Sequence, residues 1–260
     1  MKIASWNVNS LKVRLPQVLD WISLNQPDVL CLQETKQNND NFPHDVFEKR
    51  GLFSYHNGQN TYNGVAIISN KELIDVQFDI PNFYDEQKRL ISGIYPNDED
   101  PKFRVISAYI PNGQSLNSDK FEYKMNWLKS FINFLQTKID GIENIITGDF
   151  NIAPSTLDCY DSKSWDGKIL VSPQEREYFD KLLNLGFIDT FREMNPNANE
   201  FSWWDYRIPF KRNLGMRIDH ILLSKTLLPF LKKAYIDKAT RTLERPSDHV
   251  PVVTELSLNP

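Results

Sequence analysis

Short runs of apolar, β-branched residues recur along the chain between turn-forming residues, and this pattern limits the possible folds more than any other feature. Each run has the length of a strand rather than of a helix. The runs cover Ile3–Val8, Val29–Gln33, Val65–Ser69, Leu90–Tyr95, Phe103–Ile110, Asn144–Thr147, Ile218–Leu223 and Val250–Leu256. No helical pattern interrupts the stretch between Tyr62 and Ile110, so we expect antiparallel, hairpin-type pairing there.

Three segments have a helical pattern instead. Segment Asp119–Ile139 carries apolar residues at steps of three and four, which places them on one face of a helix. Ser172-Pro173-Gln174-Glu175 is a helix start, and this helix should end near Gly186. Leu15–Leu24 is a weaker candidate. Strands that alternate with helices predict a mixed sheet, or a pair of sheets, covered by helices, but they do not give the strand order.

Length and charge narrow the classes of protein. The 260 residues suffice for one large α/β domain or two small ones, and 40% apolar residues can build a substantial core. The net charge of −4 excludes a uniformly basic surface but not a local basic stripe for phosphates. No apolar run approaches the ~20 residues of a membrane span. The N-terminus lacks a signal-peptide pattern, and Cys31 and Cys159 lack metal spacing, so we expect a cytosolic protein with reduced cysteines.

Polar side chains gather at the ends of four predicted strands. Residues two positions apart on a strand point to the same face, so Asn7 lies on one face with Asn9, and Asp149 on one face with Asn151. The residues concerned are Asn7, Asn9, Glu34, Asp149, Asn151, Asp248 and His249. Oxygen donors of this kind suit Mg²⁺ or Mn²⁺ rather than Zn²⁺. Taken singly, each has an ordinary alternative as a turn former, a cap or a buried histidine with satisfied hydrogen bonds. Taken together and in this order, they predict a metal site.

Five motifs in this order resemble the exonuclease III family of abasic-site endonucleases. They are Ser5-Trp6-Asn7-Val8-Asn9, Leu32-Gln33-Glu34-Thr35-Lys36, Gly148-Asp149-Phe150-Asn151-Ile152-Ala153-Pro154, Met216-Arg217-Ile218-Asp219 and Pro246-Ser247-Asp248-His249-Val250-Pro251-Val252. That family belongs to the endonuclease/exonuclease/phosphatase superfamily, which also holds deoxyribonuclease I. The resemblance runs from Lys2 to Glu255. It implies one domain over residues 1–260, an α/β four-layered sandwich with two mixed, mainly antiparallel sheets face to face and helices outside.

The resemblance also implies metal ligands. Glu34 is similar to the main ligand, with Asn7 and Asp248 assisting directly or through water. The complete predicted set is Asn7, Glu34, Asp149, Asn151, Asp248 and His249. The expected ion is Mg²⁺, with Mn²⁺ as a substitute. Whether one or two ions act stays open, because the chain supplies enough oxygen ligands for either.

Five residues receive catalytic roles from the same resemblance. Asp149 would deprotonate the attacking water, and Asn151 would hold the phosphate or that water. His249 would donate to a phosphate oxygen as a cation, with Asp219 holding its other ring nitrogen. Tyr109 would place its hydroxyl at the phosphate. The alternatives are an aromatic residue at the rim for Tyr109 and a strand cap for Asp219.

The composition of segment Phe201–Arg217 indicates what kind of molecule the protein binds. Aromatic residues interleaved with cations are typical of nucleic-acid surfaces, although such tryptophans can also be core and such cations solvated. In the family this loop forms an apolar pocket for a flipped abasic sugar, and extruding a nucleotide is easiest when its base is missing. The predicted DNA-binding residues are Trp203, Trp204, Tyr206, Lys211, Arg212, Met216, Arg217 and Ile218.

The predicted function is a Mg²⁺-dependent DNA phosphodiesterase of base excision repair. It would nick 5′ to abasic sites and act as a 3′–5′ exonuclease on 3′ ends of double-stranded DNA, as a monomer in the cytoplasm or on a bacterial nucleoid. The loop Pro111–Leu116 lacks the Arg that some relatives insert into the duplex, and Met216 stands where some relatives have Trp. The alternatives are a phosphodiesterase of the superfamily that acts on RNA, phosphoinositide or sphingomyelin, and an inactive binding module.

Overall fold

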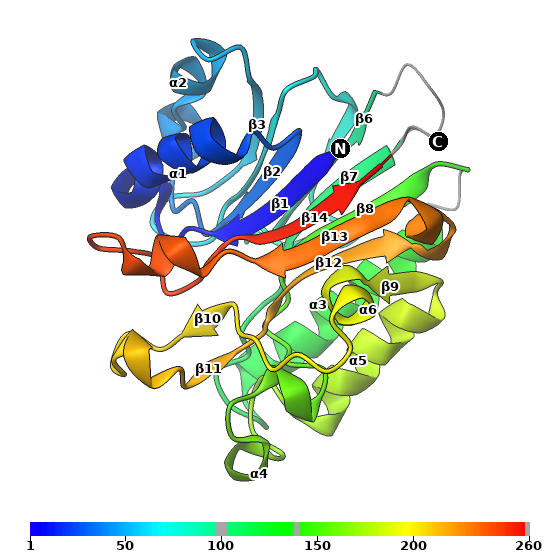
Figure 1. Ribbon diagram of the computed structural model, residues 1–260. Coiled ribbons are helices and arrows are strands. Elements are labelled where there is room, and N and C mark those ends of the chain that lie inside the picture. The colour runs from blue at the N-terminus through cyan, green and yellow to red at the C-terminus, as the bar shows by residue number, and fades with distance from the viewer. Residues whose placement is uncertain (97–102, 138–140, 258–260) are drawn as a thin grey trace.

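Two six-stranded β-sheets form the centre of the molecule (Figure 1). The computed structural model describes residues 1–96, 103–137 and 141–257. In spatial order, the first sheet contains β13 (Leu231–Ile236), β14 (Val252–Leu256), β1 (Lys2–Asn7), β2 (Val29–Gln33), β4 (Val65–Ser69) and β3 (Phe53–Asn57). The second contains β5 (Ile74–Phe78), β6 (Leu90–Tyr95), β7 (Phe103–Tyr109), β8 (Glu143–Asp149), β12 (Asp219–Ser224) and β9 (Phe187–Asp189). A separate ribbon pairs β10 (Trp203–Trp204) with β11 (Gly215–Met216).

Helices cover the outer faces of both sheets (Figure 1). The first sheet is covered by α1 (Leu11–Asn25) and α2 (His44–Glu48), and the second by α3 (Asp119–Thr137) and α5 (Pro173–Asn184). The short helices α4 (Ser162–Trp165) and α6 (Thr190–Met194) lie in connections. This order of layers confirms the predicted four-layered α/β sandwich. Within the described residues, no helix is long and apolar enough to cross a membrane.

Three apolar clusters hold the layers together. The central cluster joins the facing sides of the two sheets, and its fully buried members include Ile3, Cys31, Ile67, Val105 and Ile145. The two outer clusters join each sheet to its helices, through Trp6 and Phe47 on one side and Phe131 and Phe179 on the other. Since removal of apolar surface from water drives folding, these clusters make the sheets a rigid support.

Two parallel strand pairs decide where polar side chains meet. β1 pairs parallel with β2, in register Asn7 with Gln33, and β7 pairs parallel with β8, in register Tyr109 with Asp149. Helices α1 and α3 form the two crossovers. Parallel neighbours end at the same edge, so Asn7, Glu34, Tyr109 and Asp149 arrive together. β12 runs antiparallel to β8 and begins with Asp219 directly opposite Asp149.

The predicted strands all occur, three of them with unchanged bounds: β2, β4 and β6. Hairpin pairing is confirmed for β5, β6 and β7, whereas β4 belongs to the other sheet. Helix α1 starts four residues before the predicted Leu15, since the helix continues through Pro16. The predicted end of the long helix at Ile139 lies outside the described residues. The strands missed by the sequence analysis, such as β5 and β13, are partly exposed and lack a continuous apolar run.

Candidate active site

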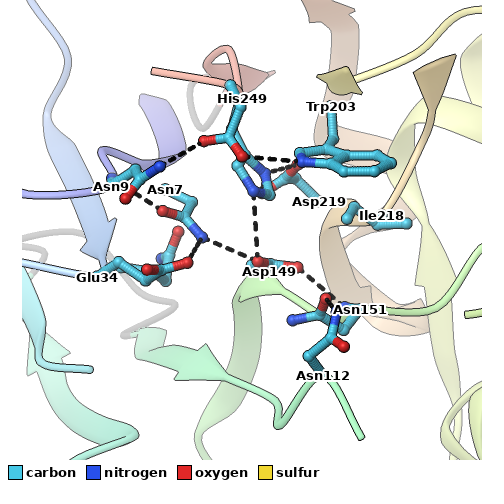
Figure 2. A network of polar contacts seen from close by, with 12 residues as sticks. Asn7, Asn9, Glu34, Asn112, Asp149, Asn151, Trp203, Ile218, Asp219 and His249 are labelled. Atoms are coloured by element: carbon cyan, nitrogen blue, oxygen red, sulfur yellow. Dashed lines mark hydrogen bonds and ion pairs between the residues drawn. The ribbon is translucent and has the colours of Figure 1, made fainter. Parts of the chain in front are cut away.

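One edge of the two facing sheets carries the predicted catalytic side chains (Figure 2). Asn7 ends β1, Glu34 directly follows β2, and Asp149 ends β8. Asp219 begins β12, and His249 lies three residues before β14. These residues are separated by up to 242 positions in the sequence, yet a single network of polar contacts joins them.

The side-chain amide of Asn7 links the two carboxylates. Its Nδ2 donates to Glu34 Oε1 and to Asp149 Oδ2, at 2.9 Å in each case. The hydroxyl of Tyr109 donates to the same Glu34 oxygen at 2.9 Å. Asn7 is fully buried, so its amide keeps one orientation. The two carboxylates are therefore held close together by the Asn7 amide that they share.

Backbone conformation at this edge is locally strained. Glu34 has φ +52° and Asn151 has φ +50°, a left-handed region that non-glycine residues rarely occupy. Gly148 has φ +148°, and a Cβ there would lie 1.8 Å from the carbonyl oxygen of Ala108. Only glycine allows β8 to approach β7 this closely directly before Asp149. Such strain persists where the surrounding structure enforces it, which is typical of functional sites.

His249 is held as a cation by two carboxylates. Its Nδ1 lies 2.8 Å from Asp219 Oδ2, and its Nε2 lies 3.7 Å from Asp149 Oδ2. Ser202 Oγ donates to Asp219 Oδ2 at 2.6 Å and so orients that carboxylate. Burial alone lowers the pKa of an imidazole, but the charges of Asp219 and Asp149 outweigh it and raise the pKa of His249 to about 10. The ring is therefore a charged hydrogen-bond donor at neutral pH.

The buried carboxyl of Asp149 has a raised pKa. Burial raises the pKa of Asp149 to about 7, with the His249 cation opposing the shift and the Asp219 and Glu34 carboxylates adding to it. Its other oxygen, Oδ1, accepts the backbone N–H of Asn151 at 2.9 Å. Burial and then the Glu34 charge raise the pKa of Tyr109 well above its ordinary value, so that hydroxyl stays protonated.

The donor set fits a hard divalent cation. Glu34, Asp149 and His249 bring side-chain atoms within 4.8 Å of one another. A protonated imidazole has no lone pair to offer, so with His249 in its charged form the two carboxylates would be the ligands of this group. Carboxylate oxygens dominate this set, as Mg²⁺ and Mn²⁺ prefer. The other predicted ligands have different partners: Asp248 accepts from Asn9 and Trp203, and the Asn7 amide orients both carboxylates through its nitrogen. Asn151 Oδ1 accepts from Asn112 Nδ2 at 2.9 Å.

The predicted DNA-binding residues separate into exposed and buried ones. Tyr206, Lys211 and Arg212 are exposed on the connection between β10 and β11. Trp204 is 1% exposed and packs edge-on against Phe210. A direct DNA contact does not fit its position, because its ring belongs to a small core cluster.

Arg217 is also buried, at 1% exposure, and this burial corrects its assignment to the DNA surface. Its guanidinium pairs with Asp158 at 2.7 Å and with Asp189 at 2.8 Å. These carboxylates satisfy a charge that could not otherwise be buried. Arg217 is therefore a residue of the scaffold.

The residues expected to line a sugar pocket form an apolar cluster. Met216 and Ile218 are 0% and 2% exposed and pack with Leu170 and Cys159. Trp203, opposite Met216 in the ribbon, keeps part of its surface accessible. The ribbon is attached to the site by a bridge between Trp203 and His249. The three residues do lie together beside the site, but Met216 and Ile218 are covered.

The sequence analysis did not identify three residues of this network. Asn112 contacts Asn151, and Lys36 Nζ lies 3.0 Å from Glu34 Oε2. Arg89 stacks over the ring of Tyr109 at 4.7 Å and donates to its carbonyl oxygen at 3.1 Å. Lys36 lies inside the Glu34 motif, two residues after the carboxylate that it pairs with. Asn112 follows Pro111 directly after the Tyr109 strand, a position that could have indicated it.

The fold and the site together are those of a hydrolytic enzyme. Such an enzyme gathers carboxylates, amides and a charged histidine at one edge of two facing sheets. The Endonuclease/Exonuclease/phosphatase family matches residues 4–249, and the chain belongs to this family. It is 37% identical to exodeoxyribonuclease III of Haemophilus influenzae, covering 98% of this chain and 99% of that protein. The predicted family resemblance is thereby confirmed.

Solved structures agree with this assignment. The 3′ phosphatase NExo from Neisseria, bound to a product DNA hairpin, superposes with a TM-score of 0.95 at 43% identity and 99% coverage of both chains. An AP endonuclease from Archaeoglobus fulgidus gives a TM-score of 0.94 at 34% identity, covering 99% of this chain and 100% of the other.

The buried location of Arg217 predicts a large effect on stability. Arg217→Met should lower the free energy of unfolding by ~3–5 kcal/mol, because the two buried carboxylates would lose the guanidinium between them and only Asp158 would keep a second arginine, Arg192. Arg212→Met is the matched control on the exposed loop and should change stability by less than ~0.5 kcal/mol. Urea unfolding at equilibrium measures both. Equal stability of the two variants would contradict the scaffold role.

Proposed function

We propose that the chain is a Mg²⁺-dependent phosphodiesterase of DNA repair that nicks 5′ to abasic sites and removes nucleotides or blocking groups from 3′ ends. The observation that carries this proposal is the joint network of Asn7, Glu34, Asp149, Asp219 and His249 at one sheet edge. The names of the similar proteins, an exodeoxyribonuclease, a 3′ phosphatase and an AP endonuclease, support it.

Glu34 would hold the metal together with Asp149 and the neighbouring amides, and the bound ion would polarise a phosphate oxygen as a Lewis acid. Asp149 takes the proton from the attacking water as a general base, since its carboxylate lies at the centre of the network between Asn7 and His249. His249 donates from Nε2 to a non-bridging phosphate oxygen, and Asp219 keeps its ring oriented and charged. Tyr109 and Asn151 offer further donors to the phosphate.

The exposed loop between β10 and β11 would bind the duplex. Lys211, Arg212 and Tyr206 supply charge and stacking surface, and Trp203 lies between this loop and His249. Met216 and Ile218 are covered, so of the three predicted pocket residues Trp203 would offer the accessible apolar surface to a sugar. All residues of the site come from one chain, and we propose that the monomer is active.

Metal removal tests the proposal directly. Purified protein with Mg²⁺ or Mn²⁺ should release nucleotides from a 3′ end and nick an abasic duplex, and excess chelator should abolish both reactions. The products are resolved on a denaturing gel, with an RNA tail, an inositol phosphate and sphingomyelin as alternative substrates. Undiminished DNA cleavage in chelator would exclude the metal, and faster turnover of an alternative substrate would exclude DNA as the main substrate.

Two substitutions test the assigned proton chemistry. Asp149→Asn removes the base and His249→Ala removes the charged donor, so each should lower kcat by ~10² or more. His44→Ala is the matched control, because His44 is exposed on α2 away from this edge. Single-turnover cleavage and circular dichroism separate loss of chemistry from loss of fold. If His249→Ala cleaves at the parental rate, the ring has no role at the phosphate.

Salt dependence tests the DNA-binding loop. Each lost phosphate contact should reduce the slope of log K against log salt by about 0.9. Lys211→Ala combined with Arg212→Ala should therefore weaken binding to intact and abasic duplex alike and flatten the slope. Trp203→Ala removes apolar surface and no charge, so the slope should persist while the preference for abasic DNA falls. Fluorescence anisotropy at several salt concentrations measures both, and identical slopes for all variants would place the contacts elsewhere.

A further inference from the structure

A lysine is buried beneath the catalytic edge. Lys124 lies in α3 on the face that packs against the core and is 0% exposed. Its Nζ donates to Glu175 Oε1 at 2.5 Å, to the carbonyl oxygen of Asn151 at 2.7 Å and to that of Asn112 at 3.2 Å. An ammonium group has three donors, and here each of them has an acceptor.

Its partner Glu175 is equally fixed. Glu175 is 0% exposed and forms the capping box at the start of α5. Its Oε2 accepts from the backbone N–H of Ser172 at 3.0 Å and from its hydroxyl at 2.7 Å, and its Oε1 also accepts from the N–H of Leu170 at 3.1 Å. The lysine is thus anchored to the helix layer rather than to a mobile side chain.

The two carbonyl groups belong to residues of the proposed phosphate site. Asn112 Nδ2 donates to Asn151 Oδ1 at 2.9 Å, and the N–H of Asn151 donates to Asp149 Oδ1 at 2.9 Å. Asn151 has a left-handed backbone, which positions its carbonyl toward the lysine instead of a neighbouring strand. One ammonium therefore connects two loops that approach the edge from β7 and β8.

Stability alone does not account for a charge pair here. Two apolar side chains of similar volume are often as stable as a buried ion pair or more so, because both charges lose their hydration. Only a donor with several N–H bonds can hold two carbonyl oxygens from different loops at once. The placement of the pair therefore points to control of loop geometry.

We propose that Lys124 and Glu175 are positioning residues that hold the side-chain amides of Asn112 and Asn151 at the reacting phosphate. This inference rests on the proposed function, in which the Asn151 amide faces the phosphate, and Asn112 donates to that amide at 2.9 Å. Neither charged group touches the substrate, since both are enclosed between α3, α5 and the loops. A displacement of about 1 Å in such groups can lower a rate by ~10².

The test separates positioning from stability with a charge-neutral pair. Lys124→Met alone leaves Glu175 unpaired, so the decisive variant is Lys124→Met with Glu175→Gln, which removes both charges. Leu128→Ala, one turn along the same buried face of α3, is the matched control because it destabilises the core without removing a charge or a hydrogen bond to either loop. All proteins are assayed with Mg²⁺ on a duplex with a recessed 3′ end, well below their unfolding temperatures.

The double variant should stay folded, with kcat reduced about 10- to 100-fold and KM within about threefold of the parent. Leu128→Ala should keep the parental kcat. Lys124→Arg, which keeps the charge and several donors, should recover part of the rate. A double variant with the kcat of Leu128→Ala would overturn the proposal.

A structural readout keeps the two proposals distinguishable. Crystal structures of the parent and the double variant should show displaced amides of Asn112 and Asn151, with Asp149 and His249 unmoved. If the parent cleaves no DNA, the proposed function fails, while this comparison still tests positioning. Unmoved amides in the double variant would exclude the positioning role whatever the activity.

Discussion

The concentration of negative charge at one sheet edge is the constraint on which the rest of the structure depends. Two unit charges 4 Å apart at a protein surface interact by about 4 kcal/mol, so several carboxylates cannot share an edge without compensation. Each carboxylate here has its own compensating group. The Asn7 amide joins Glu34 to Asp149, the His249 ring joins Asp149 to Asp219, and Asn9 donates to Asp248. Residual negative potential at Glu34 and Asp149 attracts a cation.

The groups that compensate these carboxylates must be held in place by rigid strands from both sheets. The parallel pairs β1–β2 and β7–β8 end at the same edge, and their sheets pack through a shared core. Strain at Glu34 and the close approach at Gly148 are tolerated because buried strands precede them. Helix α3 contributes in two ways, since its apolar face closes the outer layer and its one buried cation reaches the loops above.

The sequence predicted most of this arrangement, for identifiable reasons. Central strands such as β2 and β4 are buried on both faces and therefore appear as continuous apolar runs. The edge strand β5 has only exposed and half-buried residues, and the sequence analysis missed it. The residues of the candidate active site were predicted because they occur in motifs that follow one another in the family's order. Composition could not tell that Arg217 is buried while Lys211 is exposed, because both belong to the same basic, aromatic segment. Lys124 is recognisable in the sequence as a lysine within the apolar face of a helix.

An acidic protein can hold a polyanion only if its charges are separated in space. The net charge of −4 is an average over the chain, whereas binding depends on the local field. The carboxylates of the candidate active site are largely buried and accept hydrogen bonds, so their electric field in the solvent is weak. Lys211 and Arg212 are exposed on a loop that the ribbon connects to the segment of His249. At physiological salt the Debye length is about 8 Å, so a phosphate near this loop is screened from distant acidic surface. The loop can therefore attract the backbone while the buried carboxylates keep their affinity for a cation.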